Sequence, residues 1–372
     1  MKFKNQEDID LAKSLISPPG DTLLETIEHL GISQTDLATR MARPLKTINE
    51  IIQGKAAITP ETAIQLERVT EIPADFWMER EKNFRLELAQ ILEAEQSIQE
   101  KEWLLNFPCK EMIRLGWIQV SSRDPLECIE AIYRFFRVGN KEGFYNSSCY
   151  STLSEGAFRL TNQESKNPYA LAAWLRQGEI QAQELEVKVF DKKKFREALD
   201  EIKSIMANHP EDFFIRLTQL AGEAGVKVVH TPSLLNAKVH GSTRWVGDTP
   251  VIQLSNQFKR NDIFWFTFFH EAGHILKHGK KDVFVEGLDY TEEGKIKEEE
   301  ANAFAVEQLF SKKEEAEFLT QANETGLSID LIHSFSKEIK THPAIILGRM
   351  EHNGLLPHGT GMKLGIIKKL EI

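Results

Sequence analysis

The sequence predicts a mainly α-helical chain with one small β-sheet, organised in more than one domain. Its 372 residues, of which 41% are hydrophobic, exceed one ordinary domain and are enough to form real cores. Apolar residues recur at helical spacing along most of the chain. Two short segments break this pattern, the run VKVVH and the stretch from Val239 to Leu254, where Gly247 and Asp248 are typical of a hairpin turn.

The charge and cysteine content exclude several classes of protein. Lysine and arginine total 46 against 56 acidic residues, which gives a net charge of −10. The chain as a whole is therefore not a basic protein that binds nucleic acid through its overall positive charge. Any contact with DNA must be made by a local patch of basic residues. Cys109, Cys128 and Cys149 are odd in number and widely spaced, which argues against a disulfide framework and against CxxC metal knuckles.

Neither a signal peptide nor a membrane span is predicted. The first residues, MKFKNQEDID, have no apolar core, and the densest apolar run, from Ile263 to Phe269, is far below the roughly 20 residues that cross a bilayer. We therefore expect a cytoplasmic protein.

The spacing of apolar residues and the positions of proline and glycine divide the chain into four parts. Residues 1–80 contain short helical segments separated by proline and glycine, for which we expect a bundle of five helices. Residues 81–102 form a helical connector without either residue, with Phe84 and Ile91 at helical spacing. Residues 103–235 are a helical region that leads into the last part, and residues 236–372 form its core and a helical tail.

The strongest motif is HEAGH, which starts at His270. On a helix, residues four apart lie on one face, so His270 and His274 can both reach one ion at about 2.0–2.1 Å. Glu271 can meet a water on that ion and take its proton. With 11 histidines in the chain, about 0.03 such motifs are expected by chance. The upstream FWFTFF predicts a buried helix, in which these polar groups need partners. A metal-free network of the same side chains is the alternative.

A catalytic zinc site needs a third protein ligand besides a solvent position. The acidic helix start that follows some two dozen residues later offers Glu298, Glu299 and Glu300. We choose Glu300, because it directly precedes a stripe of small residues that lets two helices approach closely. The alternative is that all three carboxylates are solvated charges at a helix N-terminus.

These motifs resemble the ImmA/IrrE metallopeptidase family, whose pattern is HExxH followed by a helix of the form E-A-N/D-x-F-A. The similarity runs from about Trp103 to Met350 and includes GSTRW and the WLRQGE segment. It implies a zincin-like domain with a zinc-dependent endopeptidase site, in which His270, His274 and Glu300 are ligands and Glu271 is the general base. The sequence does not exclude another divalent ion.

Two further residues are candidates for stabilising a tetrahedral transition state. His342 and Arg244 could each donate to an oxyanion, although a histidine before proline is also typical of a helix start. His278 continues the four-residue spacing of His270 and His274, but it lies about 6 Å beyond His274 along the helix axis. We expect it to interact with the helix dipole.

A second motif set, in residues 33–55, predicts a helix-turn-helix. Ser33 is placed to cap one short helix, and LKTINEIIQG forms the next, with isoleucines inward and polar residues outward. Residues 40–55 carry a local charge of +3, where phosphates would lie. The residues that we expect to contact operator DNA are Arg40, Arg43, Lys46, Thr47, Asn49 and Lys55.

Residues 17–80 resemble the HigA-type antidotes of the phage-repressor (XRE) class, through GISQTDLA, TINEIIQGK, ITPETA and the FWMER ending. The resemblance implies operator binding as a homodimer and contact with a toxin. Ala42, Arg43 and Pro44 depart from the usual turn into the second helix and remove a serine cap. Residues 1–80 carry a net charge of −4, so a purely protein-binding bundle is the alternative.

The two motif sets together predict a DNA-binding regulator with a peptidase-like domain that cleaves or binds a partner protein, such as a repressor or toxin. A repressor that senses metal or ligand without catalysis is the second hypothesis. An antitoxin that mainly neutralises a toxin is the third.

Overall fold

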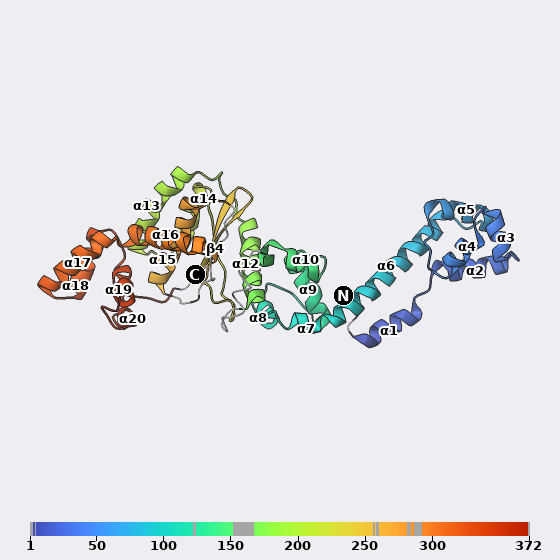
Figure 1. Ribbon diagram of the computed structural model, residues 1–372, viewed down its shortest axis with the longest axis horizontal. Coiled ribbons are helices and arrows are strands. Elements are labelled where there is room, and N and C mark those ends of the chain that lie inside the picture. The colour runs from blue at the N-terminus through green and yellow to red at the C-terminus, as the bar shows by residue number, and fades with distance from the viewer. Residues whose placement is uncertain are drawn as a thin grey trace. The chain divides into compact units, whose positions relative to one another are not determined.

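A computed structural model confirms a mainly helical chain with one small sheet (Figure 1). It describes residues 3, 5–121, 124–151, 167–255, 257, 260–280, 284–285 and 292–370. The chain forms two compact units, one of residues 1–105 and 119–132 and the other of residues 106–118 and 133–372. No helix in these described ranges is long and apolar enough to cross a membrane.

The first unit contains the predicted helix-turn-helix. Its helices are α1 (Gln6–Leu15), α2 (Pro19–His29), α3 (Gln34–Arg40), α4 (Leu45–Ile52), α5 (Pro60–Thr70), α6 (Ala74–Gln99) and α7 (Lys101–Leu104). A core of aliphatic side chains from α2 to α5 packs on Trp77 of α6. The predicted boundary at residue 80 falls inside α6, because the same helix completes this core and continues as the connector. Ile9 of α1 packs on Ile91 further along α6.

Local sequence sets the geometry of α3 and α4. Ser33 caps α3 as predicted, in a capping box in which its hydroxyl and the Asp36 carboxylate each bond a backbone N–H. Ala42, in the turn between the two helices, has a left-handed φ of 49°. This conformation costs an L-residue about 1 kcal/mol, which the packing of the buried side chains of α3 and α4 must offset. Gly20 allows α2 and α4 to touch, because a Cβ there would lie 2.1 Å from the Ile52 carbonyl oxygen.

The second unit is built on a four-stranded sheet of order β1-β3-β2-β4. The strands are β1 (Lys227–His230), β2 (Gly241–Val246), β3 (Thr249–Leu254) and β4 (Phe284–Val285), and only the β1–β3 pair is parallel. The predicted hairpin is β2–β3, and Gly247 takes φ 61° in its two-residue turn. The predicted boundary at residue 235 lies between two strands of this one sheet, so β1 belongs to the C-terminal core.

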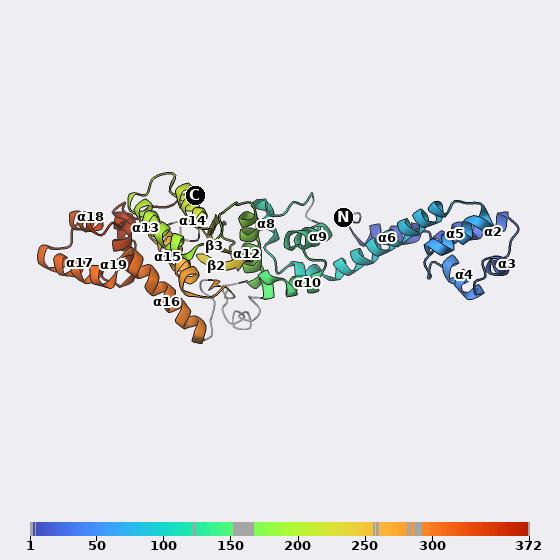
Figure 2. The same cartoon turned by 90° about the horizontal axis from the view of Figure 1, so that it is seen from above.

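Helices cover both faces of the sheet (Figures 1 and 2). On one face α12 (Pro168–Gln183) packs on β1 and β3, and on the other α15 (Asn261–Lys277) packs on β2 and β3. The remaining helices are α8 (Cys109–Arg114), α9 (Pro125–Phe136, shared between the units), α10 (Lys141–Asn146), α13 (Lys192–Asn208), α14 (Phe213–Glu223), α16 (Glu292–Leu309), α17 (Lys312–Thr325), α18 (Ile329–Glu338), α19 (Pro343–His352) and α20 (Thr360–Lys363). The largest hydrophobic core surrounds α15, which fixes that helix between the sheet and α16.

Candidate metal centre and DNA-binding surface

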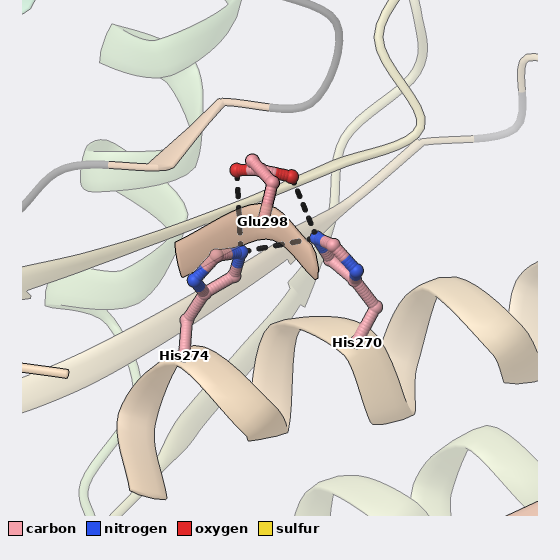
Figure 3. A group of neighbouring side chains, drawn as sticks. All are labelled: His270, His274 and Glu298. Atoms are coloured by element: carbon pink, nitrogen blue, oxygen red, sulfur yellow. Dashed lines mark hydrogen bonds and ion pairs between the residues drawn. The ribbon is translucent and has the colours of Figure 1, made fainter. Parts of the chain in front are cut away.

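The HEAGH motif lies in the middle of α15, where both imidazoles are buried. The exposed fraction of His270 is 3% and that of His274 is 2%. The four-residue spacing places both rings on one face of the helix (Figure 3). Their Nε2 atoms are 3.0 Å apart, so the two rings point to the same space.

Glu298 of α16 completes this group. Its carboxylate oxygens lie 3.3 Å from His270 Nε2 and 3.4 Å from His274 Nε2 (Figure 3). Together the three form the one cluster of His, Cys, Asp and Glu with metal-ligand spacing in the described part of the chain. The two helices approach closely at Gly273, where a Cβ would lie 3.3 Å from Ala301 Cα. Small residues at this crossing let the Glu298 side chain reach the imidazoles.

The third candidate ligand is therefore Glu298, and the choice of Glu300 is corrected. The Glu300 side chain is 51% exposed and its Oε2 lies 3.0 Å from His278 Nε2, whereas the Glu298 side chain is 18% exposed. The reason is helical phase, because residues 298, 301 and 305 share one face, and residue 300 is rotated by about 100° from residue 301. Ala301 and Ala305 mark the packed face, and counting back three residues from Ala301 would have identified Glu298.

A second layer of hydrogen bonds orients both imidazoles. His270 Nδ1 donates to the amide oxygen of Asn302, 2.9 Å away. His274 Nδ1 lies 3.0 Å from His278 Nδ1, and His278 in turn bonds Glu300. Because the Glu300 carboxylate can only accept, His278 donates through Nε2 and accepts from His274 through Nδ1. Both motif histidines thus carry their proton on Nδ1 and direct an Nε2 lone pair into the site.

Burial sets the charges of this group. Burial lowers the pKa of His274 to about 4, more than the nearby Glu298 raises it, so the ring is neutral at neutral pH. Phe284 of β4 stacks on the His274 ring at 3.7 Å and excludes water from that side.

The donor set fits a divalent metal ion. Two neutral imidazole nitrogens and one carboxylate are a common zinc ligand set, and at bonds of about 2.0–2.1 Å tetrahedral donors lie roughly 3.3 Å apart. The observed separations are 3.0, 3.3 and 3.4 Å. Among the residues that the structure describes, the buried Oε1 of Glu298 also has no hydrogen-bond partner. Three electron-rich atoms that face one buried point repel one another unless a cation lies between them.

Glu271, the candidate base, is held against the sheet. Its exposed fraction is 1%, and its Oε2 accepts a 2.6 Å hydrogen bond from the Thr243 hydroxyl of β2. Gly241, two residues earlier on the same face, leaves room for the carboxylate, because a Cβ there would lie 2.7 Å from Glu271 Oε1. The alternation of a strand places both residues toward α15. Thr243, Asn302 and the role of His278 were not predicted from the sequence, because their contacts with Glu271, His270 and Glu300 join residues more than 20 positions apart.

Arg244 and His342 lie outside this site. Arg244 follows Thr243 on β2, so its side chain is on the opposite face of the sheet, where it donates to the Leu175 carbonyl of α12 at 2.5 Å. The His342 ring caps α19, accepting from the Ala344 N–H through Nδ1 at 3.1 Å. Its neighbouring ring is His209, 5.7 Å away. The contacts described for either residue do not include the motif histidines, so the predicted oxyanion role is corrected for both.

The predicted DNA-contacting residues lie on and around α4. Arg40, Lys46 and Lys55 are exposed, and Thr47 is half-buried. Lys46 forms a weak ion pair with Glu50 at 3.7 Å, with 85% of its side chain exposed. Two residues are less accessible to DNA than predicted. Arg43 donates to Gln65 of α5 at 2.6 Å, and the amide oxygen of Asn49 is buried.

Comparisons with known proteins identify both parts of the chain. Residues 23–77 match the Helix-turn-helix family, and residues 221–335 match the IrrE N-terminal-like domain. The chain is 32% identical over 72 residues to the uncharacterized HTH-type transcriptional regulator YddM of Escherichia coli (strain K12), a match that covers 19% of this chain and 77% of the relative. These matches confirm the helix-turn-helix and ImmA/IrrE resemblances.

Two further similarities concern a small part of the chain. Virulence-associated protein A of Dichelobacter nodosus is 33% identical over 61 residues, which are 16% of this chain and 60% of that protein, so the chain spans less than two thirds of it. A solved structure of the Pseudomonas aeruginosa antitoxin HigA with higBA promoter is 28% identical, with a TM-score of 0.21, and covers 22% of this chain and 89% of that chain.

The geometry predicts different metal affinities for two neighbouring variants. Glu298→Gln removes the charged ligand, and we expect the zinc Kd to weaken by at least about 1,000-fold. Glu300→Gln alters only the residue that orients His278, and we expect a loss of about tenfold or less. Competition titration with a chromophoric chelator measures both constants, and circular dichroism checks folding. A larger loss in Glu300→Gln than in Glu298→Gln would contradict the assignment.

The burial of His342 predicts an acid-sensitive C-terminal unit. Burial first, and then the nearby His209, lower the pKa of His342 to about 4. The unfolded chain, with a pKa of about 6.5, therefore binds a proton between pH 6.5 and 4 that the folded chain does not, and stability falls as the pH falls. His342→Asn keeps a capping oxygen, and we expect it to remove about 2 kcal/mol of the stability lost between pH 7 and 4.5.

Urea denaturation of the full chain at several pH values tests this expectation. His358→Asn, which replaces an exposed histidine, is the control and should leave the pH dependence unchanged. An unaltered pH dependence in His342→Asn would show that His342 does not account for the effect.

Proposed function

The chain belongs to the helix-turn-helix transcriptional regulators and carries an IrrE-like peptidase domain, and from this premise we propose that it binds operator DNA and hydrolyses a peptide bond in a partner protein. The convergence of His270, His274 and Glu298 on one buried point carries the catalytic half of this proposal. We further propose that hydrolysis, or binding of the partner, changes repression of its own or a neighbouring operon.

The DNA-binding half rests on α3 and α4. The capping box fixes the start of α3, and the buried Ile48 and Ile51 orient α4 so that Lys46 faces solvent. In a helix-turn-helix the second helix enters the major groove and its first turns contact bases and phosphates. Operators for this motif are commonly two half-sites, so we propose that a homodimer binds them.

The catalytic half follows from what each side chain can do. His270, His274 and Glu298 would hold the metal, and a bound zinc ion would supply the positive charge that polarises a peptide carbonyl and acidifies a water. Glu271 accepts the proton from the attacking water and returns it to the leaving amine. The hydrogen bond from Thr243 holds the Glu271 carboxylate in one orientation. Asn302 keeps the His270 proton on Nδ1, so that Nε2 remains a ligand atom.

Removal of one phosphate-binding cation tests the DNA surface. Lys46→Ala should weaken binding to all DNA sequences and reduce the slope of log K against log salt by about 1, because one fewer counterion is released. Fluorescence anisotropy with the promoter fragment upstream of the gene measures both. Lys82→Ala, which removes an exposed lysine of α6, is the control. Equal salt slopes in the two variants would place the DNA contact elsewhere.

Glu271→Gln tests hydrolysis separately from metal binding. The variant keeps the side chain's shape but cannot accept the proton, so we expect zinc binding within threefold of wild type and cleavage reduced by at least about 100-fold. Mass spectrometry of candidate repressors and toxins incubated with each protein measures cleavage. If the wild type and Glu271→Gln both bind zinc, release operator DNA identically and cleave no partner, the domain is a sensor and the catalytic proposal is wrong.

A further inference from the structure

A cavity of about 330 Å³ lies next to the candidate metal centre, between α15, α16 and α19. Its apolar walls are Ile263 and Phe266 of α15, Val306, Leu309 and Phe310 of α16, and Ile345 of α19. We propose that this cavity holds one large apolar side chain of the peptide that binds at His270, His274 and Glu298. The inference rests on the proposed function and names the substrate class of that site.

The position of the cavity follows from the helical repeat. Along α15, Phe266 lies one turn before His270, and along α16, Val306 lies one turn after Asn302, the partner of His270. One turn separates the cavity from the metal-binding layer by about 6 Å along the axes. The Phe266 ring lies 6.4 Å from the His270 ring at an angle of 29°, so it forms both a cavity wall and a neighbour of a ligand. An extended peptide advances about 3.3 Å per residue, so about two residues from the scissile bond cover this distance.

The walls favour an apolar occupant. Ile263, Phe266 and Val306 are only half-buried although they belong to a packed domain, so they retain apolar surface that faces the cavity. Polar side chains also line the cavity, namely His240, Thr267, His352, Asp262 and Arg349, and the last two of these already form ion pairs. Asp262 binds Arg260 at 2.7 Å, and Arg349 lies 3.8 Å from Glu315.

The volume is large enough for one apolar side chain of a peptide. An apolar cavity of about 150 Å³ is enough to bind benzene, and sites for drug-sized ligands begin at about 300 Å³. The observed space therefore suits a leucine or phenylalanine side chain together with part of its backbone.

Binding of hydroxamates to the zinc-loaded full chain tests this inference, because a hydroxamate chelates zinc without needing catalysis. The probes are the hydroxamates of N-acetylated glycine, leucine and phenylalanine, and isothermal titration measures their affinities. We expect the leucine and phenylalanine compounds to bind at least tenfold more tightly than the glycine compound, from the apolar surface that each buries.

Filling the cavity should abolish this preference. In Val306→Trp we expect the three compounds to bind within threefold of one another while the affinity for the glycine compound is retained. Ile263→Trp is a second filling variant in case the first folds poorly. Glu307→Trp adds the same bulk at an exposed position of α16 and should keep the preference.

The outcomes separate the two proposals. Equal affinity of the three compounds for wild type, or a preference that survives both filling variants, overturns the cavity inference alone. Failure of every hydroxamate to bind the zinc-loaded chain overturns the proposed metal centre and this inference with it.

Discussion

The close crossing of α15 and α16 is the constraint on which the C-terminal site depends. Gly273 and Ala301 bring the two helix backbones together, and Phe304 packs against the same glycine. A larger residue at either position would move α16 outward and carry Glu298 away from the imidazoles. The glycine of HEAGH thus has a packing role as definite as the ligand role that we assign to the two histidines.

Electrostatics then explains why this buried crossing is polar. Burying two imidazoles and a carboxylate among aromatic side chains is unfavourable without compensation. Asn302 and His278 satisfy the Nδ1 atoms, but the hydrogen bonds that they form leave both Nε2 lone pairs directed at Glu298. The second layer therefore prepares a site that a cation would stabilise. Glu300 contributes to this layer through its hydrogen bond with His278. Within three residues of α16, Glu298 is thus a candidate ligand and Glu300 orients a neighbouring histidine.

The two units differ in how they present their functional side chains. The helix-turn-helix unit exposes cations on a short helix whose isoleucines are buried, in a domain that is acidic in total. Binding to a polyanion then depends on the local placement of a few side chains rather than on net charge. The C-terminal unit instead encloses its functional groups between a sheet and two helices, where Thr243 and Phe284 limit their motion and their contact with water.

The sequence alone determined the helical class, the β2–β3 hairpin, the Ser33 cap and the pair of motif histidines. Each depends on contacts within a few residues, namely helical periodicity, a glycine turn, a capping box and the four-residue stripe. Tertiary structure decided the third candidate ligand, because the phase of α16 against α15 selects Glu298 over Glu300. It also placed Arg244 on the far face of the sheet and His342 at a helix cap, since both positions depend on how distant segments pack.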